Sequence, residues 1–402
     1  ISTIVDCLVT KDGKSTLYCC FPVYYISSYE THQAAYTYYV ANLSNLNIEK
    51  VIIVRYKNGK DKENKYSENN FHYENFTKKV QSHKRQKIIN EQIGNLYYHL
   101  KNNSTPKFSP FHYCIKPFIC PLKKYCYERE LGKEENIFNL TDTKFSLMLK
   151  MYWKGITKID DIDKRQVLSK RTVMQIDAYK AKKEITIYKD LYSRYKSLLP
   201  IEDFLVIEID YIETLTVEGY ASNVTSKQPF VYTIHYYQKS INTSTEYSDI
   251  IDKTPNSSSV KELIYKFIGK IHMYDDLKIV VFNKEKVLKP LFALLDSNSE
   301  EYYHLSQISK KVIDLEEVFL NKEYYHPSFK GSSYLKDICK ITAPGTYQDL
   351  DIIKTGIQVS NFHKEMTRNG KSLSEDSINT IYSYLTKDTL AIIEVKRYEF
   401  CF

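Results

Sequence analysis

Short apolar runs separated by polar turns predict alternating strands and helices at the start of the chain. Residues 4–9 and 16–21 are two strand-like runs, and the Asp-Gly pair at 12–13 is typical of a hairpin turn between them. Residues 29–43 have the length and pattern of a helix, and residues 50–56 those of a further strand. This order of elements predicts an α/β unit.

A second α/β pattern begins at Asp203, just after Pro200 ends a charged, helix-like stretch. The runs that predict strands are 204–210, 229–237 and 277–282. The runs that predict helices are 260–274, 286–295 and 376–397. The second half of the chain is therefore predicted to be a mixed unit of strands and helices.

The residues between these patterns separate the two halves. Residues 58–72 are polar and predict a loop, residues 74–99 predict a helix, and residues 106–127, rich in Pro and Cys, fit neither type. Residues 145–199 read as short charged helices. Since 402 residues exceed one comfortable core, we expect two domains. Their predicted bounds are 1–130 and 201–402, with a helical linker over 131–200.

Charge and composition narrow the class of protein only a little. The net charge of +8 permits binding to DNA or RNA without requiring it. No apolar run reaches the roughly eighteen residues of a membrane span, so no membrane association is expected. The eight cysteines do not form a secreted disulfide pattern, which indicates a reducing cytoplasm. Because the chain starts at Ile1, we expect that an N-terminal segment has been removed.

Three of the cysteines are evenly spaced. Cys114, Cys120 and Cys126 each follow the previous one by six positions, in a segment stiffened by Pro117 and Pro121. Thiolates at such short spacing suit a soft metal or an iron–sulfur cluster. Zinc, or three inert thiols in a core, are the alternatives that the spacing leaves open.

The most distinctive stretch is residues 324–336 (YYHPSFKGSSYLK), which follow Ile313-Asp314-Leu315 and precede Tyr384-x3-Asp388. This succession resembles a bacterial domain-of-unknown-function family that joins two nuclease-like halves. One half is RecB-like, of the PD-(D/E)XK type, and carries cysteines. The other is of the DEDD exonuclease type, with an RNase H-like fold. The resemblance implies an α/β chain with a partial RecB-like core, a helical linker and an RNase H-like mixed sheet.

The resemblance places a degenerate site in the first half. Asp6 matches the family's metal-binding Asp, and Gln33 matches its helix Gln. The family's Glu-x-Lys position reads Tyr18-Cys19-Cys20, so the second acid and the lysine are absent. We therefore expect this half not to cleave nucleic acid, whether Asp6 and Gln33 are remnants or ordinary polar residues. The resemblance also implies that the cysteine motif takes its fourth cysteine from upstream of the core.

In the second half the resemblance implies four carboxylates around Mg²⁺ or Mn²⁺. Glu208 and Asp210 take the first-strand positions in reversed order, and on a strand they share one face. Glu285 takes the third position, in a motif shorter than the family's. Tyr384 and Asp388 match the last motif, one helical turn apart. Asp314 matches an aspartate that is not a ligand. We expect Glu208, Asp210 and Asp388 to bind the metal and all five site residues to face one cleft.

Two functions follow from the resemblance. The first is a metal-dependent 3′–5′ exonuclease-like hydrolase of DNA or RNA, of the DEDD type with a tyrosine, weakened by its altered motifs. The second is a catalytically degenerate module that binds nucleic acid or a protein partner. The spacing alone is also compatible with an acidic face and a buried tyrosine that form no functional site. A lysine or arginine paired to these acids would favour the binding module.

Overall fold

The computed structural model is a mixed α/β structure, in agreement with the predicted class, and it separates into two compact units, Ile1–Lys123 and Lys124–Phe402. It describes residues 2–57, 71–105, 107, 110–111, 114–115, 119–132, 136–166, 169–181, 186–187, 193, 197–215, 225–350, 353, 355–368 and 370–398. Within these residues no helix is long and apolar enough to cross a membrane.

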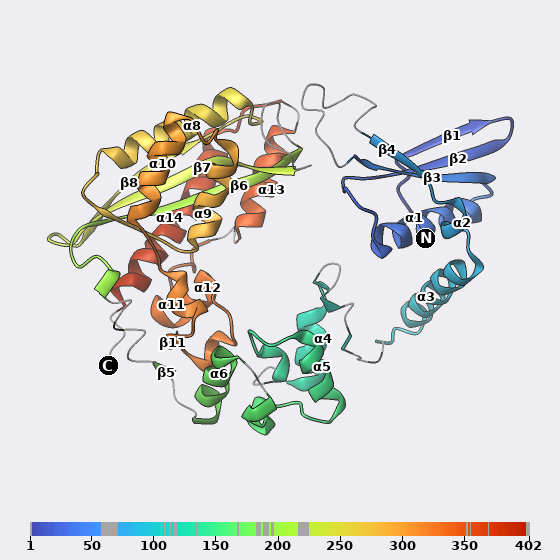
Figure 1. Ribbon diagram of the computed structural model, residues 1–402, viewed down its shortest axis with the longest axis horizontal. Coiled ribbons are helices and arrows are strands. Elements are labelled where there is room, and N and C mark those ends of the chain that lie inside the picture. The colour runs from blue at the N-terminus through green and yellow to red at the C-terminus, as the bar shows by residue number, and fades with distance from the viewer. Residues whose placement is uncertain are drawn as a thin grey trace. The chain divides into compact units, whose positions relative to one another are not determined.

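The first unit is a four-stranded sheet with helices, shown in blue in Figure 1. Its strands pair in chain order; β2 and β3 are parallel and the other pairs antiparallel. The strands are β1 (Cys7–Lys11), β2 (Lys14–Phe21), β3 (Ile48–Tyr56) and β4 (Phe71–Asn75). The helices are α1 (Ser28–Leu43), α2 (Thr77–Val80) and α3 (His83–Lys101). The Ser27 side chain caps α1, and Glu30 completes a capping box, which fixes where this helix begins.

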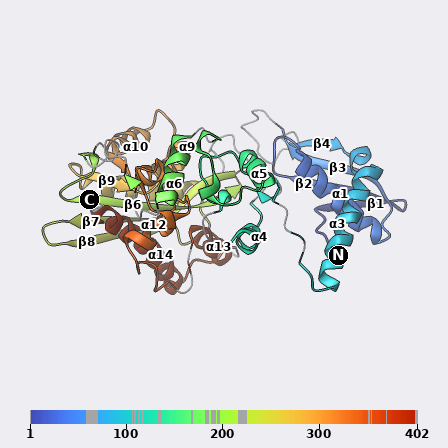
Figure 2. The ribbon, with the colours of Figure 1, turned by 90° about the horizontal axis from the view of Figure 1, so that it is seen from below.

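The second unit is built on a five-stranded mixed sheet in the order β10-β9-β6-β7-β8. Figure 2 shows β9, β6, β7 and β8 side by side in this order. The pairs β6–β7 and β7–β8 are antiparallel, whereas β9 is parallel to both β6 and β10. The strands are β6 (Phe204–Leu215), β7 (Thr225–Gln238), β8 (Thr243–Ile250), β9 (Lys278–Val281) and β10 (Val312–Asp314).

One set of helices surrounds this sheet, and a second set forms a smaller layer beside it (Figure 1). Those in contact with the sheet or with one another are α8 (Ser257–His272), α9 (Lys284–Leu294), α10 (Glu300–Lys311), α12 (Leu335–Thr342), α13 (Gly356–Thr367) and α14 (Glu375–Arg397). The smaller layer contains α4 (Lys123–Leu131), α5 (Phe145–Trp153), α6 (Lys170–Ala181) and α11 (Glu316–Leu320), with the short strands β5 (Thr186–Ile187) and β11 (Tyr324–Tyr325).

Alternation along β6 assigns its two faces. Leu205 and Ile207 pack into a core with α8 and α9, whereas Phe204 and Val206 pack into a second core with the C-terminal part of α14. Because successive strand residues point to opposite faces, Glu208 and Asp210 continue the face of Phe204 and Val206. The register of β6 against β7 shifts directly after Asp210, which marks a bulge at the end of this run.

The 324–336 segment holds the smaller layer together. Gly331, at φ +81°, lies so close to residues 139 and 141 that an added Cβ would be 2.6 Å from the Asn139 carbonyl oxygen and from Thr141 Cγ2. Gln175 on α6 accepts a hydrogen bond from the Thr141 amide (3.0 Å). Glycine is therefore required here by both backbone conformation and space. The distinctive sequence of this segment reflects packing.

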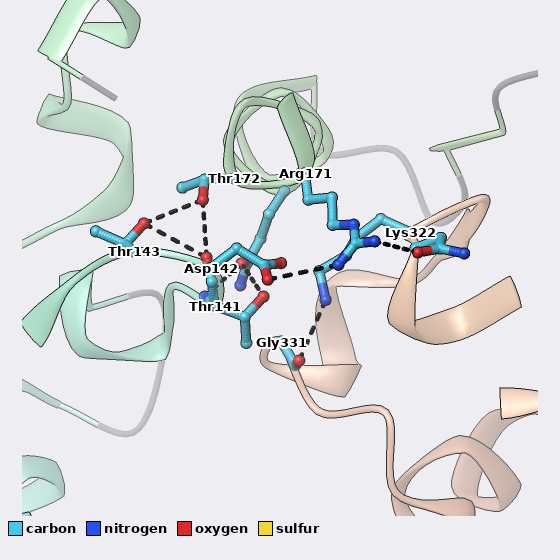
Figure 3. A network of polar contacts seen from close by, with 9 residues as sticks. Thr141, Asp142, Thr143, Arg171, Thr172, Lys322 and Gly331 are labelled. Atoms are coloured by element: carbon cyan, nitrogen blue, oxygen red, sulfur yellow. Dashed lines mark hydrogen bonds and ion pairs between the residues drawn. The ribbon is translucent and has the colours of Figure 1, made fainter. Parts of the chain in front are cut away.

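A polar network surrounds the buried Lys322 in the same region (Figure 3). Only 2% of Lys322 is exposed, and its ammonium donates to the Gly331 carbonyl (3.3 Å). Arg171 pairs with Asp142 (3.7 Å) and donates to Asn321. Burial lowers the pKa of Lys322 to about 8, although Asp142 opposes the shift. The charged lysine therefore destabilises the fold at neutral pH.

Replacing Lys322 by methionine should stabilise the chain at pH 7. The pKa falls from 10.5 to about 8 on folding, which corresponds to on the order of 3 kcal/mol, less about 1 kcal/mol for the lost hydrogen bond. Between pH 8 and 10.5 the unfolded chain binds more protons at this lysine, so the wild type regains stability as pH rises. Urea unfolding at pH 7 and pH 10 should show the advantage of the variant shrinking. An advantage that does not change with pH would contradict the assignment.

Several predicted elements differ from the structure. The helix predicted over 74–99 starts later, because residues 71–75 pair with β3 as strand β4. Most of the predicted loop 58–72 lies outside the described residues. The predicted linker over 131–200 falls, where it is described, within the second unit, and the boundary between the units is at Lys123. Strand β8 and helices α10 to α13 were not predicted.

Candidate carboxylate–lysine site

Three buried acids meet in the second unit. Glu208 and Asp210 come from β6, and Asp388 comes from α14, which packs across β6 and β7. Each acid lies close enough to raise the pKa of a neighbour: Asp388 acts on both strand acids, and Asp210 acts on Glu208. The structure thus brings together three of the four carboxylates that the sequence analysis grouped.

A lysine lies among these acids. The Lys286 ammonium forms an ion pair with a Glu208 carboxylate oxygen and lies 3.8 Å from Asp210 Oδ1. Asp388 also acts on this ammonium electrostatically. Lys286 follows β9 in the first turn of α9, so this turn projects a cation into the acidic cluster. We call Glu208, Asp210, Asp388 and Lys286 the carboxylate–lysine site.

The carboxylate of Asp314 holds the first turn of α9 in place. At the end of β10, its carboxylate accepts hydrogen bonds from the amides of Asn283 (2.9 Å) and Lys284 (2.8 Å). Asn283 is left-handed (φ 72°) and caps α9 by accepting from the Lys286 amide (2.8 Å). A short Asn side chain tolerates this conformation and this cap. Asp314 is thus a positioning residue for Lys286.

Burial and charge set the protonation of the site. Burial raises the pKa of Glu208 to about 7 and that of Asp210 to about 6, although the Lys286 ammonium opposes both shifts. Burial also raises the pKa of Asp388. Burial alone would lower the pKa of Lys286, but the carboxylates of Glu208 and Asp210 raise it well above its ordinary value. The lysine is therefore charged at neutral pH, and its charge holds the pKa of Glu208 and of Asp210 below the value that burial alone would give.

Two tyrosines and a second lysine surround Asp388. The Tyr347 hydroxyl donates to Asp388 Oδ1 (2.8 Å), and Tyr384, one helical turn before Asp388, also hydrogen-bonds to this carboxylate. The Lys336 ammonium lies 4.8 Å from the ring centre of Tyr347 and 4.6 Å from that of Tyr384. Asp388 and Asp210 act on it as opposite charges. Tyr384 therefore lies beside the Asp388 carboxylate.

Asp210 has the least satisfied carboxylate of the three. Its Oδ2 is buried and finds no hydrogen-bond partner among the residues that the structure describes. Gly356, the first residue of α13, lies beside it, and an added Cβ there would be 3.3 Å from Asp210 Oδ1. The start of a helix is favourable for a nearby anion, which offsets part of the burial. A small residue at position 356 is what lets this helix start approach the carboxylate.

Glu285 lies apart from the acids, contrary to its predicted place in the cleft. Its side chain is 83% exposed and pairs with Lys289 (3.7 Å) on the outer side of α9. In the short turn after β9, the inward position of the helix falls on Lys286, one residue later. Sequence reasoning missed Lys286, Lys336 and Tyr347. For Lys286, the available signal was the shortened motif, because a shorter turn changes which helix residue faces inward.

Mg²⁺ or Mn²⁺, which the resemblance implies, does not fit the site as it is arranged. Hard oxygen ligands are present, and the unpartnered Asp210 Oδ2 is the kind of atom a cation would satisfy. The Lys286 ammonium, however, already forms an ion pair with Glu208 at the same place. Throughout the described part of the chain, no three His, Cys, Asp or Glu side chains form a group that could hold a metal ion. We therefore derive no chemistry through a metal.

The cysteine motif is divided between the two units. Cys114 and Cys120 belong to the first unit, where the Cys120 amide donates to the Cys114 carbonyl (3.0 Å), and Cys126 lies on α4 in the second. All three are half-buried free thiols. Their convergence on an iron–sulfur cluster or zinc stays a prediction.

The first unit keeps Asp6 in a structural contact. Its carboxylate accepts a hydrogen bond from the Cys20 amide (2.8 Å) on β2. Burial and the Asp6 charge raise the pKa of the Cys20 thiol, so this cysteine is not an activated thiolate. Tyr18 is half-buried on the same strand, and Gln33 is exposed on α1. Neutral side chains therefore occupy positions 18 and 20, and Asp6 is the acid beside this strand.

A comparison with protein-family models identifies part of the chain. A family model described as Domain of unknown function (DUF2779) matches residues 220–334, well under half of the chain. The matched segment contains Lys286 and Asp314 and most of the 324–336 segment, whereas Glu208, Asp210 and Asp388 lie outside it. No curated protein matches the chain.

Proposed function

We propose that this chain is a nuclease-like protein that binds nucleic acid at the carboxylate–lysine site without hydrolysing it. The observation that carries the proposal is the Lys286 ammonium paired with Glu208 beside Asp210. In a metal-dependent exonuclease, divalent cations neutralise the acids so that a phosphodiester can approach. Here Lys286 and Lys336 bring two positive charges to three acids, and burial holds part of the remaining negative charge as bound protons.

Other features support a degenerate nuclease. The sheet joins an antiparallel run β6-β7-β8 to parallel strands β9 and β10, which is compatible with the RNase H-like order that the resemblance implies. Glu285, the fourth acid of that resemblance, is exposed and paired with Lys289. In the first unit, Tyr18 and Cys20 stand where the family has its second acid and its lysine. Both nuclease-like sites thus depart from the family at the residues that hold metal or water.

A metal-dependent 3′–5′ exonuclease-like hydrolase is the second candidate. Two observations favour it. The buried Asp210 Oδ2 has no hydrogen-bond partner among the described residues, and Tyr384 lies beside Asp388, the place from which the tyrosine subclass orients the attacking water. This candidate needs Lys286 to leave the acids. The two candidates predict different effects of EDTA and Mn²⁺: hydrolysis by the second candidate needs the divalent cation, whereas binding by the first does not.

Fluorescence anisotropy with a labelled single-stranded 12-mer of DNA, and one of RNA, tests the proposal on the full chain. We expect binding of at least one of them to be equal in EDTA, Mg²⁺ and Mn²⁺, with no shortened product on a gel. Lys336→Gln should weaken binding roughly tenfold, because a cation next to the acids is lost, which is about 1.4 kcal/mol. Lys261→Gln, an exposed change on α8, is the matched control and should leave affinity unchanged.

Two outcomes would overturn the proposal. Shortening of the 12-mer in Mn²⁺ that disappears in Asp388→Ala would establish the hydrolase instead. Absence of binding to both oligonucleotides, with a folded chain by circular dichroism, would exclude nucleic acid as the partner of this site.

A further inference from the structure

A cavity of about 510 Å³ lies next to the carboxylate–lysine site. It is formed by α12 and the residues that follow this helix. Its lining includes Lys336, Lys340, Ala343, Tyr347 and Leu350. Two of the lining residues also act on Asp388 of that site: the Tyr347 hydroxyl donates to its carboxylate (2.8 Å), and the charge of this carboxylate attracts the Lys336 ammonium. A molecule in the cavity would therefore lie beside the acids.

The lining combines an apolar wall with positive charge. Ala343, Leu350 and the Tyr347 ring supply apolar surface, and Lys336 and Lys340 supply two ammonium groups. Among the described residues that line the cavity, none is acidic. The exposed Lys340 ammonium is 2.6 Å from the carboxylate of the half-buried Asp337, on the same helix α12. Because Lys340 itself is open to solvent, this ion pair is weak, so Lys340 can turn to an anion at small expense in free energy.

Size and chemistry select among ligands. Cavities that hold small molecules usually have about 300 to 1,000 Å³, so this one accepts a group of roughly the size of one nucleotide. Inorganic phosphate would satisfy the lysines and leave the apolar wall in water. A nucleoside would cover the wall and leave the lysines without a charged partner. A phosphate attached to a flat, mainly apolar ring system uses both.

We infer that this cavity binds one nucleotide unit, with its base against Tyr347 and the apolar wall and its phosphate between Lys336 and Lys340. The inference rests on the proposed function, since the nucleotide would be the end of the bound nucleic acid. It assigns a place to that end: the terminal nucleotide lies in the cavity, and its phosphodiester link extends towards Asp388. Base stacking on an aromatic ring is tolerant of sequence, so little base preference is expected.

Isothermal titration of the full chain in EDTA tests the inference, with adenosine 5′-monophosphate, adenosine and inorganic phosphate as three separate probes. The monophosphate should bind at least tenfold more tightly than either of the other two. Lys340→Glu should weaken its binding more than tenfold, and Lys340→Arg should preserve it. Lys261→Glu on α8 makes the same change of charge on an exposed helix outside the lining and should have no effect.

Competition with the labelled 12-mer separates this inference from the proposed function. Displacement of the 12-mer by the monophosphate supports both. Binding of the 12-mer without displacement, or binding of the monophosphate that Lys340→Glu leaves unchanged, overturns the cavity assignment while the proposed function stands. Lysine-dependent binding of the monophosphate without any binding of the 12-mer supports the cavity and overturns the proposed function. Equal binding of phosphate alone would reduce the cavity to a simple anion site and overturn the inference.

Discussion

Replacing Gly331 by alanine is expected to destabilise the second unit by about 3 kcal/mol or more. The added Cβ would be 2.6 Å from the Asn139 carbonyl oxygen and from Thr141 Cγ2, so the backbone of one segment must move. The left-handed conformation at φ +81° adds a penalty of about 1 kcal/mol for any residue with a Cβ. Urea unfolding, followed by circular dichroism, measures the loss.

Gly155→Ala is the matched control for this prediction. Gly155 has nearly the same conformation (φ +83°), but an added Cβ there meets no atom of the described residues within 4 Å. The Gly155→Ala variant should lose only the conformational penalty of about 1 kcal/mol in free energy of unfolding. The difference between the two variants therefore isolates the close approach of Gly331 to residues 139–141. Equal losses in the two variants would show that this contact is not as tight as the structure has it.

Replacing Lys286 by methionine is expected to destabilise the chain by about 2 to 3 kcal/mol at pH 8. Removing one partner of a buried pair leaves an uncompensated charge, and the 45% exposure of the Lys286 side chain reduces the usual loss. Without the ammonium, the pKa values of Glu208 and Asp210 rise above about 7 and 6. An acid whose pKa is raised by folding stabilises the folded chain less as pH increases. The Lys286→Met variant should therefore lose little free energy of unfolding at pH 5 and much at pH 8.

Lys289→Met, in the same helix, is the control. Lys289 pairs with the exposed Glu285 (3.7 Å), and such a pair contributes less than about 1 kcal/mol. Its loss should be small and nearly independent of pH between 5 and 8. A Lys286→Met variant as stable as Lys289→Met at pH 8 would show that the Lys286 ammonium does not stabilise the ionised carboxylates beside it.

The same Lys286→Met variant should also take up a divalent cation more tightly than the wild type. Removing the ammonium leaves Glu208, Asp210 and Asp388 without the cation between them, so the three carboxylates can draw together around Mn²⁺, which prefers oxygen ligands. Mn²⁺ binding, followed by electron paramagnetic resonance, should strengthen at least tenfold. If the wild type binds Mn²⁺ as tightly as the variant, the lysine does not exclude the cation, and the hydrolase candidate gains.

Local sequence determined several parts of the site. The apolar run that starts at Phe204 fixes a strand, and its period of two places Glu208 and Asp210 on one face. Tyr384 and Asp388 are four apart on a predicted helix, so they share a face wherever that helix packs. These relations involve only neighbours in the chain. They are therefore visible without knowledge of the fold, as is the mixed α/β class.

Only the tertiary structure decided which side chains complete the site. Whether Glu285 or Lys286 faces the acids depends on how α9 leaves β9, and Asp314 from β10 fixes that turn with hydrogen bonds across 30 residues of sequence. Strand β4 forms because β3 offers an edge, although its first residues read as the end of a loop and its last two as the start of a helix. The glycine at 331 is explained by residues 139–141, far away in the chain. In each case a distant segment supplies the partner, and local pattern carries no information about it.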